Sequence, residues 1–159
     1  MRLNAYWVFS FLVGQEGCFM VNPKLRVLLV DEEQSRLVSI EKNLSGLGYS
    51  RVAPLTSFRD LLVILDNALC PFDLLIIHQV VLENAGEVLE QLVRSSPAIK
   101  HLLVYQGNTL QVLSTIESSS SSMRFELPCL PDREAIKQVM GFIDKVELHE
   151  VYGKQRVSV

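Results

Sequence analysis

Apolar residues along this chain follow two alternating patterns, namely short runs and longer stretches with an apolar residue at every third or fourth position. The runs lie within residues 24–30, 72–77 and 102–105, and the central run contains four consecutive apolar residues, Leu74 to Ile77. Such runs are too short for a buried helix and are typical of strands that are covered on both faces.

The stretches between these runs predict amphipathic helices. The positions that carry the helical spacing, in chain order, are Leu37, Ile40, Leu44 and Leu47; Phe58, Leu61, Leu62 and Leu65; Val88, Leu89, Leu92 and Val93; Leu110, Leu113 and Ile116; and Ile136, Val139, Met140, Ile143 and Val146. Ser57 and Asp132 are predicted N-caps. Short strands are expected at 49–53 and 124–127, and the serine run at 118–122 is expected to be a flexible loop.

Strands that alternate with amphipathic helices indicate an α/β protein with a parallel sheet and helices on both faces. Five such units fit in about 125 residues of the sequence. We therefore predict a flavodoxin-like (βα)5 doubly wound fold with strand order 2-1-3-4-5. In such sheets the functional site lies beyond the carboxyl ends of the strands.

The predicted domain covers residues 23–147, with a tail at 148–159 and an N-terminal extension at 1–22 outside the fold. The extension contains nine mostly apolar residues, Ala5–Val13. This segment is too short to span a bilayer, which takes about 20 residues. Three interpretations stay open: translation that truly starts at Met20, an extra packing or interface segment, or a weak membrane contact.

Composition narrows the class of protein. Hydrophobic residues make up 48% and charged residues 21% of the 159 residues, as in a single globular domain. The net charge of -3 gives no reason to expect direct nucleic-acid binding, and we expect no membrane association of the domain. The cysteines, Cys18, Cys70 and Cys129, lack metal-ligand or disulfide spacing and favour a reducing cytoplasm.

The domain resembles the CheY-like receiver domain of two-component response regulators. The residues that carry the resemblance are the acidic pair Asp31 and Glu32 after the first strand, the third strand at 72–77, Gly86 with the helix start after it, and the turn Leu130-Pro131-Asp132-Arg133-Glu134. The resemblance implies a bacterial signalling module of the phosphorelay type.

The chain departs from the receiver pattern at the positions on which receiver chemistry depends. His78 stands where receivers have the phospho-accepting aspartate, and Tyr105 stands where they have Thr or Ser. Leu130 takes the place of the lysine, Leu127 that of the aromatic switch residue, and Leu82 that of a proline. We treat Tyr105, Leu127 and Leu130 as degenerate switch positions.

These replacements predict the loss of phosphorylation. Aspartyl phosphorylation needs a carboxylate nucleophile and Mg²⁺ held by oxygen ligands, and a lysine neutralises the developing charge. His78 removes a ligand, Leu130 removes the cation, and Tyr105 fills the space of a small hydroxyl residue. Only the acidic pocket of Asp31 and Glu32 remains, so we expect no Mg²⁺, no other metal and no cofactor.

We therefore predict a degenerate pseudo-receiver, which is not an enzyme and acts by protein–protein interaction in the cytoplasm. A histidine kinase, an output protein or another regulator could be the partner, and a homodimer is an alternative. Receivers commonly associate through their fourth helix, fifth strand and fifth helix. The corresponding apolar positions Phe125, Leu127 and Leu130 form the candidate interaction face, and the resemblance suggests a cis bond at Leu130–Pro131.

Other interpretations of the same residues stay open. The chain could be an atypical phosphorelay regulator that accepts a phosphoryl group at His78, Asp73 or Glu83, or it could bind a divalent cation through Asp31 and Glu32. Alternatively, the His78 ring bonds to Asp31 or Glu32 and has a purely structural role.

Two enzymatic interpretations are disfavoured. A hydrolase would pair Cys129 with His78 as nucleophile and base, but no pattern brings them together. A flavodoxin-like enzyme would need a glycine-rich phosphate loop after the first strand, where the chain is acidic.

Overall fold

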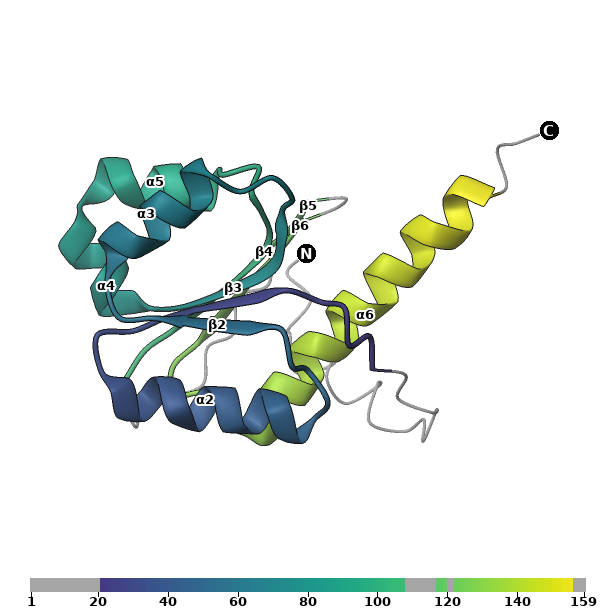
Figure 1. The fold of residues 1–159 in the computed structure, drawn as a ribbon, viewed down its shortest axis with the longest axis horizontal. Helices are drawn as coiled ribbons and strands as arrows, with labels where there is room; N and C mark the ends of the chain where they lie inside the picture. Colours follow the sequence, from purple (N-terminus) through teal and green to yellow (C-terminus); the bar gives the residue numbers. More distant parts are fainter. Residues whose placement is uncertain (1–20, 108–116, 120–121, 156–159) are drawn as a thin grey trace, which may run out of the picture.

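The computed structural model describes residues 21–107, 117–119 and 122–155, which form one six-stranded sheet between two layers of helices (Figure 1). The sheet order is β2-β1-β3-β4-β6-β5. The first five of these strands are parallel, and β5 runs antiparallel to β6 at the edge. The strand bounds are Val27–Val30 for β1, Val52–Leu55 for β2, Phe72–His78 for β3, Ile99–Tyr105 for β4, Glu117–Ser119 for β5 and Ser122–Leu127 for β6.

The helices divide between the two faces of the sheet (Figure 1). Their bounds are Gln34–Gly46 for α2, Phe58–Asp66 for α3, Gln79–Ala85 for α4, Glu87–Arg94 for α5 and Arg133–Gln155 for α6. Apolar residues of α2 and α6 pack on one face, and those of α3, α4 and α5 pack on the other. Alternate residues of β1 enter the two cores, because successive side chains of a strand point to opposite faces.

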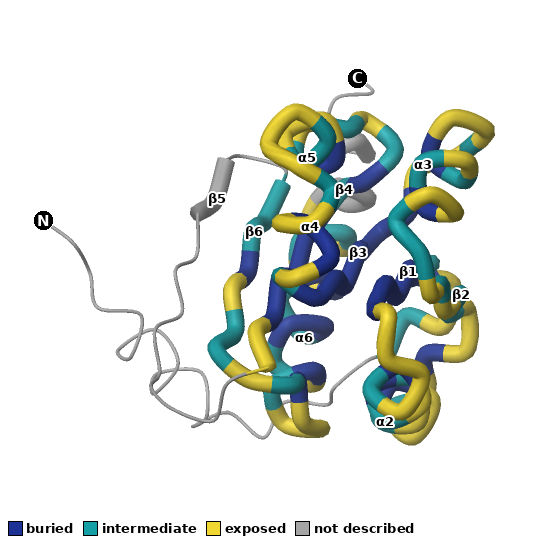
Figure 2. Tube along the Cα trace, turned by 90° about the vertical axis from the view of Figure 1, so that its left-hand side faces the viewer, coloured by how far each residue is buried: buried dark blue, intermediate teal, exposed yellow. Residues whose placement is uncertain are grey.

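Burial explains why these elements form where they do. Every residue of β1 and β3 is buried, as the continuous apolar runs predict (Figure 2). The Ser57 side chain accepts a hydrogen bond from the Asp60 amide at 3.1 Å, and that of Asp132 accepts one from the Ala135 amide at 2.8 Å. Both predicted N-caps are thus confirmed.

The predicted fold and the order of the five parallel strands are confirmed, but several details differ. Residues 117–119 and 122–124 pair as a hairpin, so the expectation of a flexible loop at 118–122 is wrong for the described part. Pairing supplies partners for backbone groups that the edge of β6 would otherwise leave open. The helix predicted around Leu110, Leu113 and Ile116 lies outside the described residues.

Two helices also depart from the prediction. The sequence predicted no helix between the strand at 72–77 and the helix around Val88, but α4 forms there and buries Val81 and Leu82. Gly86, with φ of +91°, separates α4 from α5. In addition, α6 continues to Gln155, whereas the domain was predicted to end at residue 147 and a tail to follow from residue 148.

The chain joins the core before the predicted boundary at residue 23. Val21 packs against the core on the α2 and α6 side, and a Cβ on Gly48 would lie 3.3 Å from Cγ1 of Val21. The Asn22 carbonyl accepts a hydrogen bond from the Leu25 amide at 3.3 Å. Val21 and Asn22 therefore belong with the packed domain.

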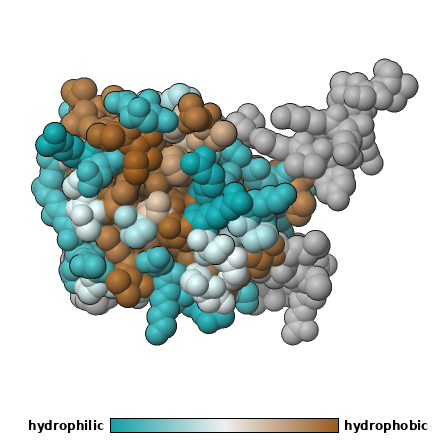
Figure 3. Space-filling view, viewed as in Figure 1, coloured by the Kyte–Doolittle hydropathy of each residue, from teal (hydrophilic) through white to brown (hydrophobic). Residues whose placement is uncertain are grey.

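Exposed apolar side chains gather on the helical layer made by α3, α4 and α5. They are Val63, Val80, Val88 and Leu92, and Leu69 follows the end of α3. Figure 3 shows hydrophobic surface over this layer, at the upper left of the view. None of the helices in the described parts of the chain is both long and apolar enough to cross a membrane.

Candidate functional site

The carboxyl edge of the sheet brings together the residues that the sequence singled out. Val30, the last residue of β1, is in register with Ile77 of β3, and His78 is in register with Tyr105 of β4. Asp31 follows β1 directly, so its side chain, the His78 ring and the Tyr105 ring meet at one edge. This is the edge at which parallel α/β sheets carry their sites.

Asp31 is the centre of the site and is fully buried. Its Oδ1 accepts hydrogen bonds from the Glu33 amide at 2.8 Å and from Nη2 of Arg36 at 2.7 Å. Its Oδ2 accepts hydrogen bonds from Nε of Arg36 at 2.6 Å and from the Tyr105 hydroxyl. A carboxylate offers about four lone-pair sites, so these donors saturate it.

The same contacts fix the charge of the site. Burial by itself would raise the pKa of Asp31, but the hydrogen bonds from Arg36, Tyr105 and the Glu33 amide outweigh it and lower that pKa. The Asp31 hydrogen bond raises the pKa of Arg36, and burial followed by the Asp31 bond raises the pKa of Tyr105. The site is therefore an Asp31 anion paired with an Arg36 cation, with a neutral Tyr105.

Arg36 was missed by the sequence analysis. It lies in the first turn of α2, five positions after Asp31, and forms a fork of two parallel hydrogen bonds with that carboxylate. It also pairs with Glu33. A long cation one helical turn after an acidic strand end is a signal that could have suggested this contact.

Tyr105 occupies the interior as predicted. It is fully buried, and its hydroxyl group binds Asp31. Its ring lies 5.1 Å from the His78 ring, tilted by 54°. The tyrosine thus fills the space at the end of β4 and ties it to the end of β1.

His78 does not bind Asp31, contrary to the structural alternative raised above, because Arg36, Tyr105 and the Glu33 amide take that carboxylate. The histidine is 6% exposed, and its Nε2 has no hydrogen-bond partner among the described residues. A Cβ on Gly107 would come within 3.3 Å of this Nε2, so the backbone at Gly107 closes over the ring.

The remaining acidic residues do not complete a metal site. Glu32 is exposed, and Glu33 binds Arg36 and the Ser35 hydroxyl. Within residues 21–107, 117–119 and 122–155, no group of three or more His, Cys, Asp or Glu side chains could hold a metal ion. The predicted acidic pocket of Asp31 and Glu32 is thus reduced to Asp31 alone.

The switch positions near β6 are mostly covered. Phe125 is buried, with its ring 6.3 Å from that of Phe142 on α6, so it belongs to the core and cannot contribute to an exposed face. Leu127 and Leu130 are half-buried against the same core. The Leu130–Pro131 bond is trans, so the suggested cis bond is wrong.

The other candidate acceptors lie away from the site or are already bonded. Asp73 sits at the opposite end of β3, where Lys100 lies 3.0 Å away and the Arg26 amide donates to it at 2.7 Å. The Glu83 carboxylate accepts a hydrogen bond from Gln79 at 2.9 Å. Cys129 is exposed after β6.

Comparison with solved structures shows which known proteins share this architecture. A pilus assembly-related protein from Burkholderia pseudomallei has a TM-score of 0.55 and 17% identity, over 82% of this chain and 96% of its own. A response regulator receiver domain protein from Bacillus halodurans has a TM-score of 0.47 and 22% identity, over 77% and 96%.

The N-terminal domain of a response regulator, sensory box and GGDEF three-domain protein from Carboxydothermus hydrogenoformans has a TM-score of 0.48 and 14% identity, over 80% and 98%. The likeness to the Burkholderia pseudomallei protein, at a TM-score of 0.55, supports the fold alone. The sheet order shows the doubly wound fold that the resemblance to receiver domains predicted. No protein-family model matches the chain, and none of the curated proteins compared with it matches.

Proposed function

We propose that this chain is a receiver-derived signalling module that binds a protein partner without being phosphorylated. The observation that carries the proposal is the Arg36 guanidinium bound through two hydrogen bonds to the buried Asp31 carboxylate. In a receiver this carboxylate would face a divalent cation. Here an internal cation takes that role, so the charge of Asp31 is balanced without a metal.

The geometry also disfavours each step of phosphoryl transfer. A metal at Asp31 would have to displace donors that already occupy both oxygens. The residue at the acceptor position, His78, has its Nε2 buried beneath Gly107. Leu130 supplies no charge for a phosphoryl group.

The loss of the phosphorylation switch favours a surface with one conformation over a surface that changes when the domain is phosphorylated. The Tyr105 hydroxyl is held by Asp31 in the interior, and Tyr105 is in register with Leu127 of β6. The end of β4 and the neighbouring end of β6 therefore keep one conformation. A partner such as a histidine kinase, an output protein or another regulator would meet the same surface at all times.

The test is the intact mass of the full chain after incubation with acetyl phosphate and Mg²⁺. Three proteins are compared: the wild type, the variant His78→Asp with Leu130→Lys, and the same variant with Arg36→Ala and Tyr105→Thr added. We expect no phosphoryl group on the wild type, little on the first variant, and one on the second.

Two outcomes would contradict the proposal. A phosphorylated wild type would show that the switch is intact, and mapping the modified residue would identify the acceptor. Full labelling of the first variant would show that Arg36 and Tyr105 do not keep the cation from Asp31. Adding Asp31→Asn to the second variant is the matched control and should abolish its labelling.

A further inference from the structure

One apolar seam of the domain is only partly covered by the described residues. It lies between β6 and α6 and consists of Met123, Leu127, Phe142 and Val146, all of which are half-buried. Met123 and Leu127 share one face of β6 with the buried Phe125, whose ring lies 6.3 Å from that of Phe142. Phe142 and Val146 are one helical turn apart on α6.

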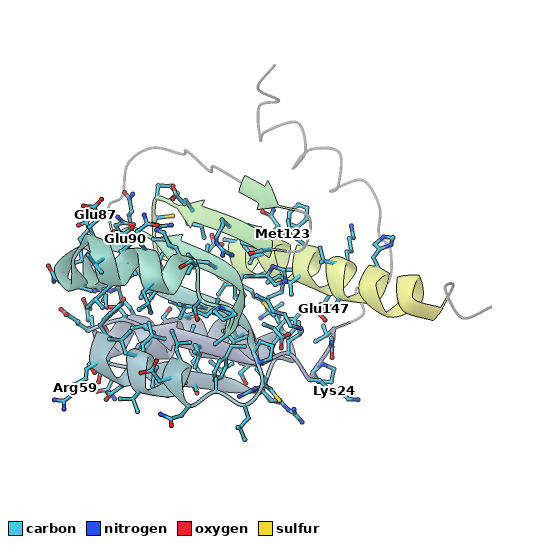
Figure 4. The ribbon with its side chains drawn as sticks, turned by 90° about the horizontal axis from the view of Figure 1, so that it is seen from above. Lys24, Arg59, Glu87, Glu90, Met123 and Glu147 are labelled. Atoms are coloured by element: carbon cyan, nitrogen blue, oxygen red, sulfur yellow. The ribbon has the colours of Figure 1, made fainter. Side chains whose placement is uncertain are left out.

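Figure 4 shows Met123 on β6, on the side of the sheet edge, and Glu147 on α6 close to the point where the helix leaves the sheet. The seam therefore lies at the outer side of the sheet, and the described residues leave it partly open to solvent.

The chain enters the domain beside the same turn of α6. Val21 packs into the core on the α2 and α6 side. The Asn22 amide lies at the Asp144 carboxylate, where its hydrogen bond opposes the rise in the Asp144 pKa that burial causes. Asp144 is two residues from both Phe142 and Val146, so it shares their level on the helix but points to the other side.

A segment of suitable chemistry lies just upstream. Ala5–Val13 has the sequence AYWVFSFLV, in which eight of nine residues are apolar or aromatic, and it ends eight residues before Val21. An extended linker of that length reaches about 26 Å. Half the circumference of a helix about 10–12 Å wide is roughly 16–19 Å, so the linker is long enough to bring the segment round α6 to the seam.

We propose that the segment Ala5–Val13 docks in cis on the β6–α6 seam of its own domain. Burial of its aromatic side chains against Met123, Phe142 and Val146 would cover apolar surface on both partners. The exposed apolar residues of α3 and α5, such as Val63 and Val88, belong to the opposite layer of the sheet, away from the point where the chain enters (Figures 1 and 3). This inference does not depend on the proposed function.

The chain contains a natural probe for this docking, because Trp7 is its only tryptophan and lies inside the segment. The experiment measures the emission maximum of Trp7 and its quenching by acrylamide in the full chain. Four proteins are compared: the wild type, Met123→Asp, Val146→Asp, and the matched control Val88→Asp, whose site is 81% exposed on α5.

We expect blue-shifted emission and severalfold weaker quenching in the native wild type than in urea, independent of protein concentration. Each seam variant should shift emission to the red and raise quenching, while Val88→Asp should behave as the wild type. Circular dichroism distinguishes loss of docking from unfolding, and Val146→Ala is a milder seam variant if either of the others fails to fold.

Several results would overturn the proposal. Trp7 would be as quenchable in the native chain as in urea if the segment does not dock. Protection that grows with protein concentration would indicate a second copy of the chain. A blue shift that appears only with phosphatidylcholine and phosphatidylglycerol vesicles would indicate a membrane surface. Protection unchanged in every seam variant would place the segment elsewhere.

Discussion

The two ends of the parallel sheet each hold a carboxylate paired with a cation. The pairs differ in how far apart the partners lie in the sequence and in how many elements they connect. At the carboxyl end, Asp31 is bound by Arg36, only five residues further along the chain. At the amino end, Lys100 of β4 lies 3.0 Å from Asp73 of β3 and 2.9 Å from Glu147 of α6. The first pair closes a local site, whereas the second joins three elements.

The pairs also differ in solvent access and chemistry. The Asp31 side chain is fully buried and bound through a planar fork, while the side chain of Lys100 is 33% exposed and acts as a point charge. Burial lowers the pKa of Lys100, but its bonds to Glu147 and Asp73 outweigh this and raise it. At the carboxyl end of the sheet, where receiver domains have their phosphorylation site, the charge pair of this chain is therefore less accessible to solvent than the pair at the amino end.

The largest effect is expected from removing Arg36. Arg36→Met leaves the Asp31 charge buried without its cation, which should lower the free energy of unfolding by about 3 kcal/mol. Urea denaturation measures the change. Because the penalty comes from the unpaired charge, the double variant with Asp31→Asn should recover a large part of it. A loss well below this value would show that Arg36 is a peripheral contact.

The next effect concerns the buried hydroxyl groups. Tyr105→Phe removes a hydrogen bond to a charged carboxylate and should cost about 2 kcal/mol. The matched control is Tyr49→Phe, which removes the 2.7 Å hydrogen bond to Asp144. Burial raises the pKa of Asp144, whereas hydrogen bonds lower that of Asp31, so the surroundings of Asp144 stabilise a carboxylate less well and we expect a smaller loss there. Equal losses of stability in Tyr105→Phe and Tyr49→Phe would show that the hydrogen bond to Asp31 is no stronger than the one to Asp144.

At the amino end of the sheet, Lys100→Met should lower the free energy of unfolding by only about 1 kcal/mol. The effect is small because water screens the partly exposed charge pairs of Lys100. The exposed Lys137→Met is the control and should change stability little. If Lys100→Met lowered the free energy of unfolding as much as Arg36→Met, the charge pairs at the two ends of the sheet would be energetically equivalent, and the Asp31 site would not be the more tightly held one.

The smallest effect is a pH dependence from His101, which is buried beside Lys100 at the amino end. Burial lowers its pKa, and its Nδ1 accepts a hydrogen bond from the Met123 amide at 3.0 Å. Because the folded pKa lies below the unfolded one, neutral His101 favours the fold. The contribution of His101 to the free energy of unfolding is therefore present near neutral pH and is lost as the pH falls below about 6.5.

The check on His101 is stability measured by urea denaturation at several acidic pH values. His101→Gln should flatten the decline, while His149→Gln, at an exposed position, should leave it unchanged. Parallel curves for the wild type and His101→Gln would rule out this contribution. The nearby charges of Lys100, Asp73, Glu147 and Arg124 are the same in both proteins.

Much of the fold could be predicted from the sequence, because β1 and β3 are buried on both faces and therefore read as continuous apolar runs. The sheet edge was harder, since β5 forms from a serine-rich stretch whose composition gives no strand signal. Its pairing with β6 comes from backbone hydrogen bonds, and these carry no side-chain pattern. The short helix α4 was missed because only Val81 and Leu82 of it are buried.

The site was predicted in position but not in its contacts. Periodicity placed Asp31, His78 and Tyr105 at one edge, since parallel strands end together. It could not show that Arg36 folds back onto Asp31, because that depends on the side-chain conformation of a helix residue. Nor could it show that Phe125 points into the core: an apolar residue near an edge suits either a core or an interface.

Whether the Asp31 site is closed to metal ions is tested by calorimetric titration of Mg²⁺ into the full chain and into its Asp31→Asn variant. If Arg36 and Tyr105 saturate the carboxylate, neither protein should show saturable binding at millimolar Mg²⁺. Saturable binding by the wild type that is lost in Asp31→Asn would show instead that a metal ion displaces Arg36 from the Asp31 carboxylate.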